Sequence, residues 1–324
     1  MNGEKITMWI LIVIAVLAIL TVAAAYGAYL KTFHARRKRD VYYMPKQLPK
    51  EIADRTRALI RAFETVPFEE VEILSHDGLR LFARYYHVAD GAPLHIQFHG
   101  YRSFALRDFC GGNPLVRGDG HNTLVVDQRA HGNSEGNTIT FGVYERMDCL
   151  RWAEYAAKRF GKDIPIFLSG VSMGAATVLM ATELPLPKNV VGVIADCPYS
   201  SPRAIIRKVI GDMKLPVPLA YPLVVFGGAL FGKIRNLSKT GAVFAVRHAK
   251  IPILIIHGEA DSFVPCEMSR EIAAANPNIR LETFPDASHA QSYMVDVARY
   301  EATSRAFIRD CLDQFHNKPK EDDI

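Results

Sequence analysis

The strongest structural signal lies in the middle of the chain, in the stretch Phe167-Leu168-Ser169-Gly170-Val171-Ser172-Met173-Gly174-Ala175-Ala176. A run typical of a buried strand gives way there to a run typical of a helix, with Ser172 between Gly170 and Gly174. This Gly-x-Ser-x-Gly spacing is typical of a tight strand-to-helix turn that holds its serine in strained backbone geometry. We expect a side chain at either glycine to collide with the bend, so both glycines make room for it.

The sequence around this stretch alternates between strand and helix patterns. Asp77-Gly78 separates two runs that predict a hairpin, 71–74 and 79–86. Apolar or alternating runs predict six further strands, at 94–98, 123–126, 164–168, 190–195, 251–256 and 279–284. Helical periodicity is clearest at 143–160, 173–183, 268–275 and 293–315. Apolar strands spaced by helices predict an α/β fold with a mostly parallel sheet covered on both faces.

In such a sheet the functional residues gather at the carboxyl ends of the strands. A serine hydroxyl there needs a base, and His289, which follows the last predicted strand, is the expected one. The imidazole needs a carboxylate that fixes its tautomer, and we expect Asp261 after the penultimate strand, with Glu259 and Asp196 as rivals. The chain order Ser172, Asp261, His289 is the order found in one class of serine sites.

Negative charge that develops on a carbonyl oxygen is commonly met by two backbone N–H groups held in place beforehand. We expect Met173 to supply one of these oxyanion-hole donors, because it opens the helix after Ser172. We expect Tyr101 to supply the other, from the loop after the strand 94–98, where Gly100 allows a tight turn.

Together these pieces resemble an α/β-hydrolase, and more narrowly the bacterial membrane-anchored esterases of the serine aminopeptidase-like and cephalosporin-deacetylase-like group. The resemblance runs in order over residues 69–315 and includes His99-Gly100, 127–136, Thr140-Phe141-Gly142 with Glu145 and Asp148, and the segments bearing Ser172, Asp261 and His289. It implies a triad hydrolase without a cofactor or metal. In this family the segment 127–136 is structural, so Asp127 and His131 receive no catalytic role.

The N-terminal region predicts a membrane anchor. Residues 8–30 carry no charge, and a helix of that length at about 1.5 Å per residue crosses the roughly 30 Å hydrocarbon layer. A cleaved signal peptide is the alternative. Lys31 and Arg36-Arg37-Lys38-Arg39 follow the anchor, and the positive-inside rule then predicts a cytoplasmic catalytic domain on a single-pass cell-membrane protein. Five scattered cysteines, without a Cys-x-x-Cys pair, also favour a reducing compartment.

Most of the formal net charge of +5 belongs to the same region. Residues 1–40 hold six Lys/Arg and two Asp/Glu, which leaves 33 and 32 in the rest of the chain. A nearly neutral body gives no argument for nucleic-acid binding. We expect the basic cluster after the anchor to pair with anionic lipid headgroups.

The chain is therefore divided into an anchor and basic segment at 1–40, a connector at 41–68 and a hydrolase domain at 69–318. About fifty residues follow Asp196 before the next strand, which predicts a cap inserted over about 200–248. Its stretch 215–231 is strongly apolar, and Pro216, Pro218 and Pro222 argue against one continuous helix there. The apolar residues form an acyl-binding pocket, a face that meets lipid, or simply packing onto the core. We see no charged cluster that marks a charged substrate.

The leading hypothesis is a membrane-anchored serine hydrolase that cleaves carboxylic ester or thioester bonds of small or lipid-like substrates through an acyl-enzyme on Ser172. A serine aminopeptidase or amidase is the alternative, and an acyltransferase or cofactor-free haloperoxidase would use the same residues. A catalytically silent binding protein on the same fold is the competing class. The sequence determines neither the natural substrate nor the oligomeric state.

Overall fold

A mixed sheet of eight strands forms the centre of the protein, whose computed structural model describes residues 3–35, 40–44 and 48–317. The strands are β1 Glu69–Leu74, β2 Arg80–Tyr86, β3 Leu94–Phe98, β4 Asn122–Asp127, β5 Ile166–Val171, β6 Val190–Asp196, β7 Ile253–Gly258 and β8 Ile279–Phe284. Their order across the sheet is β1-β2-β4-β3-β5-β6-β7-β8. The pairs β1–β2 and β2–β4 are antiparallel and the others are parallel, so the predicted edge hairpin and mostly parallel sheet are confirmed.

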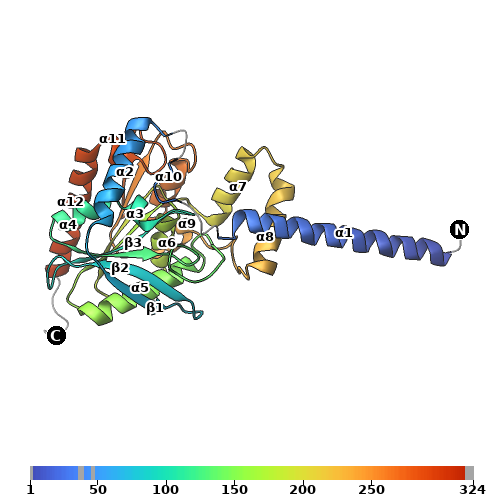
Figure 1. Ribbon diagram of the computed structural model, residues 1–324, viewed down its shortest axis with the longest axis horizontal. Coiled ribbons are helices and arrows are strands. Elements are labelled where there is room, and N and C mark those ends of the chain that lie inside the picture. The colour runs from blue at the N-terminus through green and yellow to red at the C-terminus, as the bar shows by residue number, and fades with distance from the viewer. Residues whose placement is uncertain (1–2, 36–39, 45–47, 318–324) are drawn as a thin grey trace.

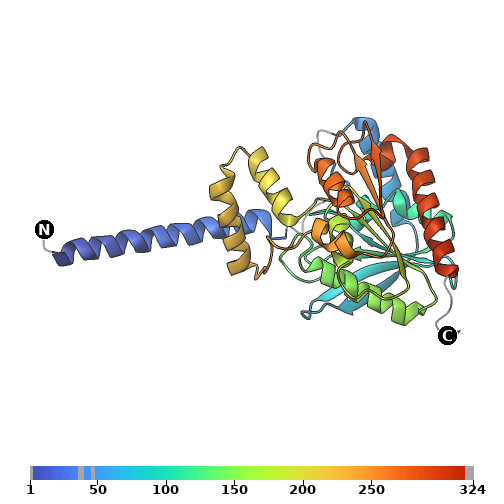
Figure 2. The same ribbon diagram turned by 180° about the vertical axis from the view of Figure 1, so that it is seen from behind.

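Helices cover both faces of this sheet (Figure 1, Figure 2). The α-helices of the described chain, of which α1 and α8 lie away from the sheet, are α1 Gly3–Thr32, α2 Lys50–Glu64, α3 Ala105–Asp108, α4 Gly112–Gly118, α5 Glu145–Phe160, α6 Met173–Ala181, α7 Pro202–Asp212, α8 Val217–Phe231, α9 Ala242–Ala245, α10 Glu267–Ala274, α11 Ser292–Val295 and α12 Val297–His316. Strand β5 shows how the two cores form. Ile166 and Leu168 join the core that contains α5 and α6, whereas Phe167 between them joins the core of α4 and α12, because successive side chains alternate across a strand.

The predicted helix 293–315 is in fact two helices, α11 and α12, which break at Asp296. Asp296 has φ −142° and ψ 84°, outside the helical region, and its side chain accepts a hydrogen bond from the Arg299 N–H. An aspartate in that role begins a new helix because it satisfies one of the first unpaired N–H groups.

The expectation that three prolines interrupt the segment 215–231 is wrong, because α8 is one helix from Val217 to Phe231. Pro216 precedes the helix and Pro218 lies in its first turn, where no intrahelical N–H bond is lost. Only Pro222 lies inside the helix and removes a backbone donor.

Helix α1 projects from the body as a long rod (Figure 1). It is exposed on all sides over residues 5–24, and it is long and apolar enough to cross a membrane. The C-terminal end of α1 is instead packed against the body, because Phe33 just beyond it is fully buried in the main core. The predicted basic cluster Arg36-Arg37-Lys38-Arg39 lies outside the described residues, as does Pro45.

Candidate active site

The turn after β5 has the geometry expected of a nucleophile elbow. Ser172 has φ +56° and ψ −111°, a strained conformation for a residue with a side chain. A Cβ at Gly170 would lie 2.3 Å from the backbone of Gly174, and one at Gly174 would lie 1.8 Å from the carbonyl oxygen of Phe98. The expected collision is therefore confirmed, and the second glycine lets α6 pack directly on β3.

Three loops at the carboxyl end of the sheet bring Ser172, His289 and Asp261 together. The Nε2 atom of His289 lies 3.0 Å from Ser172 Oγ, and its Nδ1 atom lies 2.6 Å from Asp261 Oδ2. Of the two rival acids, Asp196 accepts a hydrogen bond from the hydroxyl of Tyr300 instead. Both contacts of His289 are within hydrogen-bond distance, so a proton can pass from the serine to the imidazole without a large movement.

Asp261 is held in its charged form. Burial alone would raise its pKa, but hydrogen bonds from His257 and His289 and from the backbone N–H of Val264 outweigh that effect and keep the pKa well below the usual range. Asp261 Oδ1 also accepts from the N–H of Phe263. The carboxylate is therefore fixed in orientation as well as in charge, which suits a group that must stabilise an imidazolium.

The loop after β3 lies directly beside the serine. A Cβ at Gly100 would lie 3.4 Å from the Cβ of Ser172, and the Gly100 N–H donates to Asp108 Oδ2 at 2.7 Å. Tyr101 follows in this loop, and Met173 begins α6 immediately after Ser172. Both expected oxyanion-hole donors thus belong to segments that border the serine, and their roles stay predictions.

The same loop is fastened to the end of α1, which the sequence did not suggest. The hydroxyl of Tyr101 donates to the carbonyl oxygen of Thr32 at 2.7 Å. The guanidinium of Arg102 donates to the carbonyl oxygens of Lys31 and His34 at 2.9 and 2.8 Å. The last carbonyls of a helix have no partner within the helix, so these side chains cap α1 while α1 braces the loop.

Two buried histidines support this loop without taking part in the triad. His131 Nε2 accepts from the N–H of Arg102 and its Nδ1 donates to the carbonyl of Arg129, while His99 Nε2 accepts from the N–H of Gln128. Burial lowers the pKa of both rings, that of His131 to about 3. Neutral rings with fixed tautomers suit the structural role that the resemblance implies for His131.

Among the described residues, His76, Asp77 and Asp148 bring possible metal ligands within 4.8 Å of one another. The guanidinium of Arg129 already lies against two of them, with Nε 2.6 Å from Asp148 and its terminal nitrogens 3.0 Å from Asp77. A second such group, Cys197 with Asp261 and His289, shares two residues with the serine site. We therefore propose no metal site at either group.

A cavity of about 450 Å³ opens beside Ser172 and His289. Part of its wall comes from the region expected to be a mere connector, through Met44, Leu48 and Ile52, and further apolar wall residues follow β3. No described residue between 200 and 248 lines it. The cap therefore does not line this pocket, whereas the connector forms part of its wall. No sequence signal could reveal this, because an apolar helix face that lines a cavity has the same pattern as one that packs on a core.

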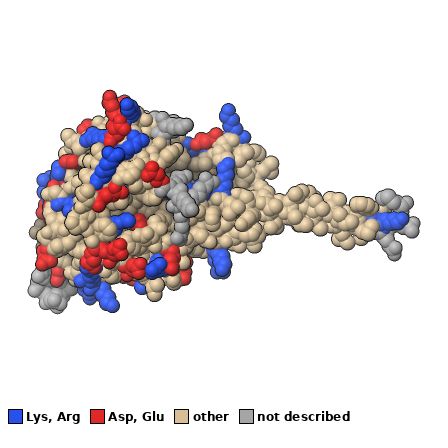
Figure 3. Space-filling model, in the orientation of Figure 1, with Lys and Arg blue, Asp and Glu red and all other residues tan. Residues whose placement is uncertain are grey.

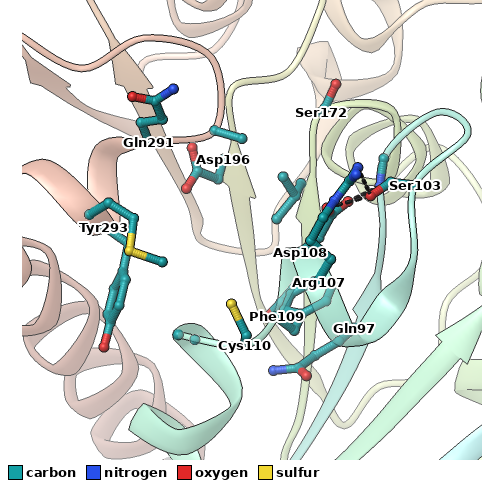
Figure 4. A pocket seen from close by; sticks show the side chains of 18 of the residues that line it. Gln97, Ser103, Arg107, Asp108, Phe109, Cys110, Ser172, Asp196, Gln291 and Tyr293 are labelled. Atoms are coloured by element: carbon teal, nitrogen blue, oxygen red, sulfur yellow. Dashed lines mark hydrogen bonds and ion pairs between the residues drawn. The ribbon is translucent and has the colours of Figure 1, made fainter. Parts of the chain in front are cut away.

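Two carboxyl groups, those of Asp108 and Asp196, line this pocket (Figure 4). Asp108 accepts hydrogen bonds from the N–H of Gly100 and from the side chains of Ser103 and Arg107. Asp196 is 6% exposed, and burial raises its pKa to about 6. Its Oδ2 atom accepts from Tyr300, while its Oδ1 atom has no hydrogen-bond partner among the described residues. Asp196 is thus a polar point in a mainly apolar cavity rather than a member of the triad.

The sequence profile of the alpha/beta hydrolase family matches residues 91–304, which is more than half of the chain. The chain belongs to the alpha/beta hydrolase family. The matched part of this hydrolase contains Ser172, Asp261, His289 and both expected oxyanion-hole residues.

Two proteins show the range of its relatives. The uncharacterized protein YqkD of Bacillus subtilis is 25% identical over 193 residues, 58% of this chain and 62% of YqkD. The monoglyceride lipase of Mus musculus is 31% identical over 134 residues, 39% of this chain and 42% of the lipase. Each match spans less than two thirds of the relative's own length.

Solved structures show the same fold. The Pyrococcus furiosus esterase Pf2001 superimposes with a TM-score of 0.61 at 21% identity, over 86% of this chain and 98% of the esterase. Est1E from Butyrivibrio proteoclasticus, solved with ferulic acid, gives 0.55 at 21% identity, over 76% of this chain and all of that chain. These relatives do not support the narrower resemblance to aminopeptidases or cephalosporin deacetylases.

Proposed function

We propose that this protein is a membrane-anchored serine hydrolase that cleaves carboxylic ester or thioester bonds of small or lipid-like substrates. The observation that supports it most strongly is the pair of hydrogen bonds from His289, at 3.0 Å to Ser172 and at 2.6 Å to Asp261. A hydroxyl, an imidazole and a carboxylate linked in this order form the arrangement that activates a serine.

The proposed reaction has two halves. Ser172 Oγ attacks the carbonyl carbon while His289 Nε2 takes its proton, and Asp261 stabilises the resulting imidazolium. The backbone N–H groups of Met173 and Tyr101 hold the oxyanion. His289 then gives the proton to the leaving alcohol or thiol, and an acyl-enzyme on Ser172 remains. Water, deprotonated by His289, attacks the acyl-enzyme and releases the acid.

The pocket favours an apolar substrate group. Its volume of about 450 Å³ lies in the range of small-molecule sites, and its walls are mainly apolar. We therefore assign it to the acyl chain of the ester. The similarity to the esterase Pf2001 and to a monoglyceride lipase agrees with a substrate of this kind.

The test is covalent labelling of the full-length protein with a fluorophosphonate probe. The wild-type chain should be labelled and should hydrolyse 4-nitrophenyl esters, and Ser172→Ala should lose both reactions. Labelling of Ser172→Ala equal to wild type would exclude Ser172 as the nucleophile. Faster turnover of aminoacyl amides than of esters would favour the aminopeptidase alternative.

The anchoring role belongs to α1, which has the length, apolarity and exposure of a membrane span. By the positive-inside rule, the basic residues that follow α1 favour a catalytic domain on the cytoplasmic side. Protease added to intact cells should leave the catalytic domain undigested. Digestion from outside would reverse this orientation.

A further inference from the structure

The cap has a charge composition that the whole-chain balance conceals. Residues 200–248 contain eight Lys/Arg and one Asp/Glu, a formal net charge of +7. Acidic residues elsewhere in the chain offset this surplus in the total. Figure 3 shows Lys and Arg at the margins of the cap and uncharged surface between them.

The uncharged surface is the outer face of α8. Leu219, Phe226 and Leu230 are 68%, 43% and 49% exposed, and their spacing of seven and four residues puts them on one side of the helix. The opposite side, with Val224 and Gly227, is buried. Helix α7 lies between α8 and the sheet in both views, so the exposed face turns away from the catalytic body (Figure 1, Figure 2).

Helix α8 also crosses the anchor and packs tightly on it. A Cβ at Gly227 would lie 2.2 Å from the carbonyl oxygen of Ala25, so only glycine allows this approach. The rings of Tyr26 and Phe231 meet edge to face with centroids 4.9 Å apart. The cap and the anchor therefore form one unit. The depth to which α1 enters a bilayer then fixes the position of α8 relative to the membrane surface.

That depth follows from the length of α1. Lys5 and Lys31 bracket an uncharged run of 25 residues, about 38 Å of helix, whereas the hydrocarbon layer is about 30 Å thick. A layer that begins just after Lys5 takes up about 20 residues and ends near Ala25, where α8 crosses. Trp9 and Tyr26 then lie near the two interfaces, where such aromatic residues concentrate.

We propose that the cap is a second membrane-binding surface, with α8 lying in the interface of an anionic leaflet beside the anchor. The exposed apolar side chains enter the boundary between headgroups and acyl chains, as in an interfacial helix. Lys214 and Lys233, which flank α8 and are exposed, meet the anionic headgroups. This inference rests on the anchoring part of the proposed function and not on hydrolysis.

The test uses the full-length protein in lipid nanodiscs made of phosphatidylcholine with phosphatidylglycerol, or of phosphatidylcholine alone. Leu219→Cys carries an environment-sensitive fluorophore, and nitroxide-labelled acyl chains in the disc act as quencher. Leu74→Cys on β1 is the matched control, because Leu74 is 62% exposed and belongs to the edge strand of the sheet rather than to the cap. All five native cysteines are buried and compete little for the label.

We expect acyl-chain quenching at position 219 and none at position 74. The quenching at position 219 gives the ratio of protein with the cap docked on the bilayer to protein with the cap undocked. Lys214→Glu with Lys233→Glu should lower this docked-to-undocked ratio about tenfold or more in the anionic discs. The control pair Lys158→Glu with Lys162→Glu, exposed residues in the last turn of α5 and just after it, should leave this ratio unchanged. Circular dichroism of each variant checks that it is folded.

Two results would overturn the proposal and can be told apart. Protein that enters the discs but shows equal quenching at positions 219 and 74 would exclude docking of the cap while leaving the anchor intact. Protein that fails to enter the discs would exclude the anchor and the docking together. Neither result bears on labelling of Ser172, so the hydrolase proposal is judged separately.

Discussion

Helices α2 and α8 both carry apolar side chains outside the main core, yet they use these side chains in opposite ways. Ile52 of α2 turns inward and lines the cavity beside Ser172, whereas Leu219 of α8 turns outward and is 68% exposed. From the sequence, α2 is part of a connector, and α8 is a candidate for an acyl-binding pocket, a face that meets lipid, or packing onto the core. The difference teaches that apolar surface belongs to a substrate only where the chain folds it against the catalytic residues.

The most severe test of this comparison is the pair Ile52→Trp and Leu219→Trp. A larger ring at position 52 should fill the inner pocket and exclude about four methylene groups of a decanoyl ester, each worth about 0.8 kcal/mol. We expect kcat/KM for decanoyl esters to fall about a hundredfold, with little change for acetyl esters. Leu219→Trp should leave both values unchanged. Equal acyl-length profiles for the two variants would remove α2 from the acyl site.

An intermediate effect, on stability, is expected from the buried carboxyl group of Asp196 in the pocket wall. The folded-state pKa of Asp196 is about 6, above its unfolded value of about 3.9, so the folded protein binds more protons between these values. The contribution of Asp196 to stability is therefore greatest below about pH 4 and falls as the pH rises through 6. Asp196→Asn carries no such charge and should raise the free energy of unfolding by about 3 kcal/mol at pH 7.5.

Thermal unfolding of the Asp196→Asn variant across pH checks this effect. The gain should vanish below about pH 4, where the wild-type carboxyl is protonated in both states. Asp212→Asn is the control on the cap side, because Asp212 is exposed and pairs with Lys208 at the surface. A gain for Asp196→Asn that is independent of pH would refute the buried charge as its cause.

The smallest effect on activity is expected from the hydrogen bond between the end of α1 and the loop beside Ser172. Tyr101→Phe removes the hydrogen bond to the carbonyl of Thr32 but keeps the backbone N–H proposed for the oxyanion hole. One such bond is worth about 1 kcal/mol, so we expect kcat to fall about fivefold with KM unchanged. Tyr144→Phe removes a comparable bond to the carbonyl of Lys233 in the cap and should leave kcat unchanged. A fall of the same size in both variants would mean a general loss of stability.

Local sequence patterns predicted much of the candidate site at the carboxyl end of the sheet. The elbow around Ser172 was predictable because its two glycines and the change from strand to helix act within a few residues. Position after a strand end identified His289 and Asp261, although it left Asp196 and Glu259 as rivals. Only the hydrogen bond of 2.6 Å between His289 and Asp261 separates these carboxylates, since all three follow strands of one sheet edge.

By itself, the sequence determined the α/β fold, the order of its strands along the chain, the elbow and the apolar helix at the N-terminus. Each of these depends on periodicity or on steric constraints between near neighbours. Tertiary structure alone decided that α2 walls the pocket, that α8 faces outward on the anchor and that the end of α1 braces the loop of Tyr101. Those contacts join segments distant in the chain, and an apolar pattern states that a face must be covered without stating what covers it.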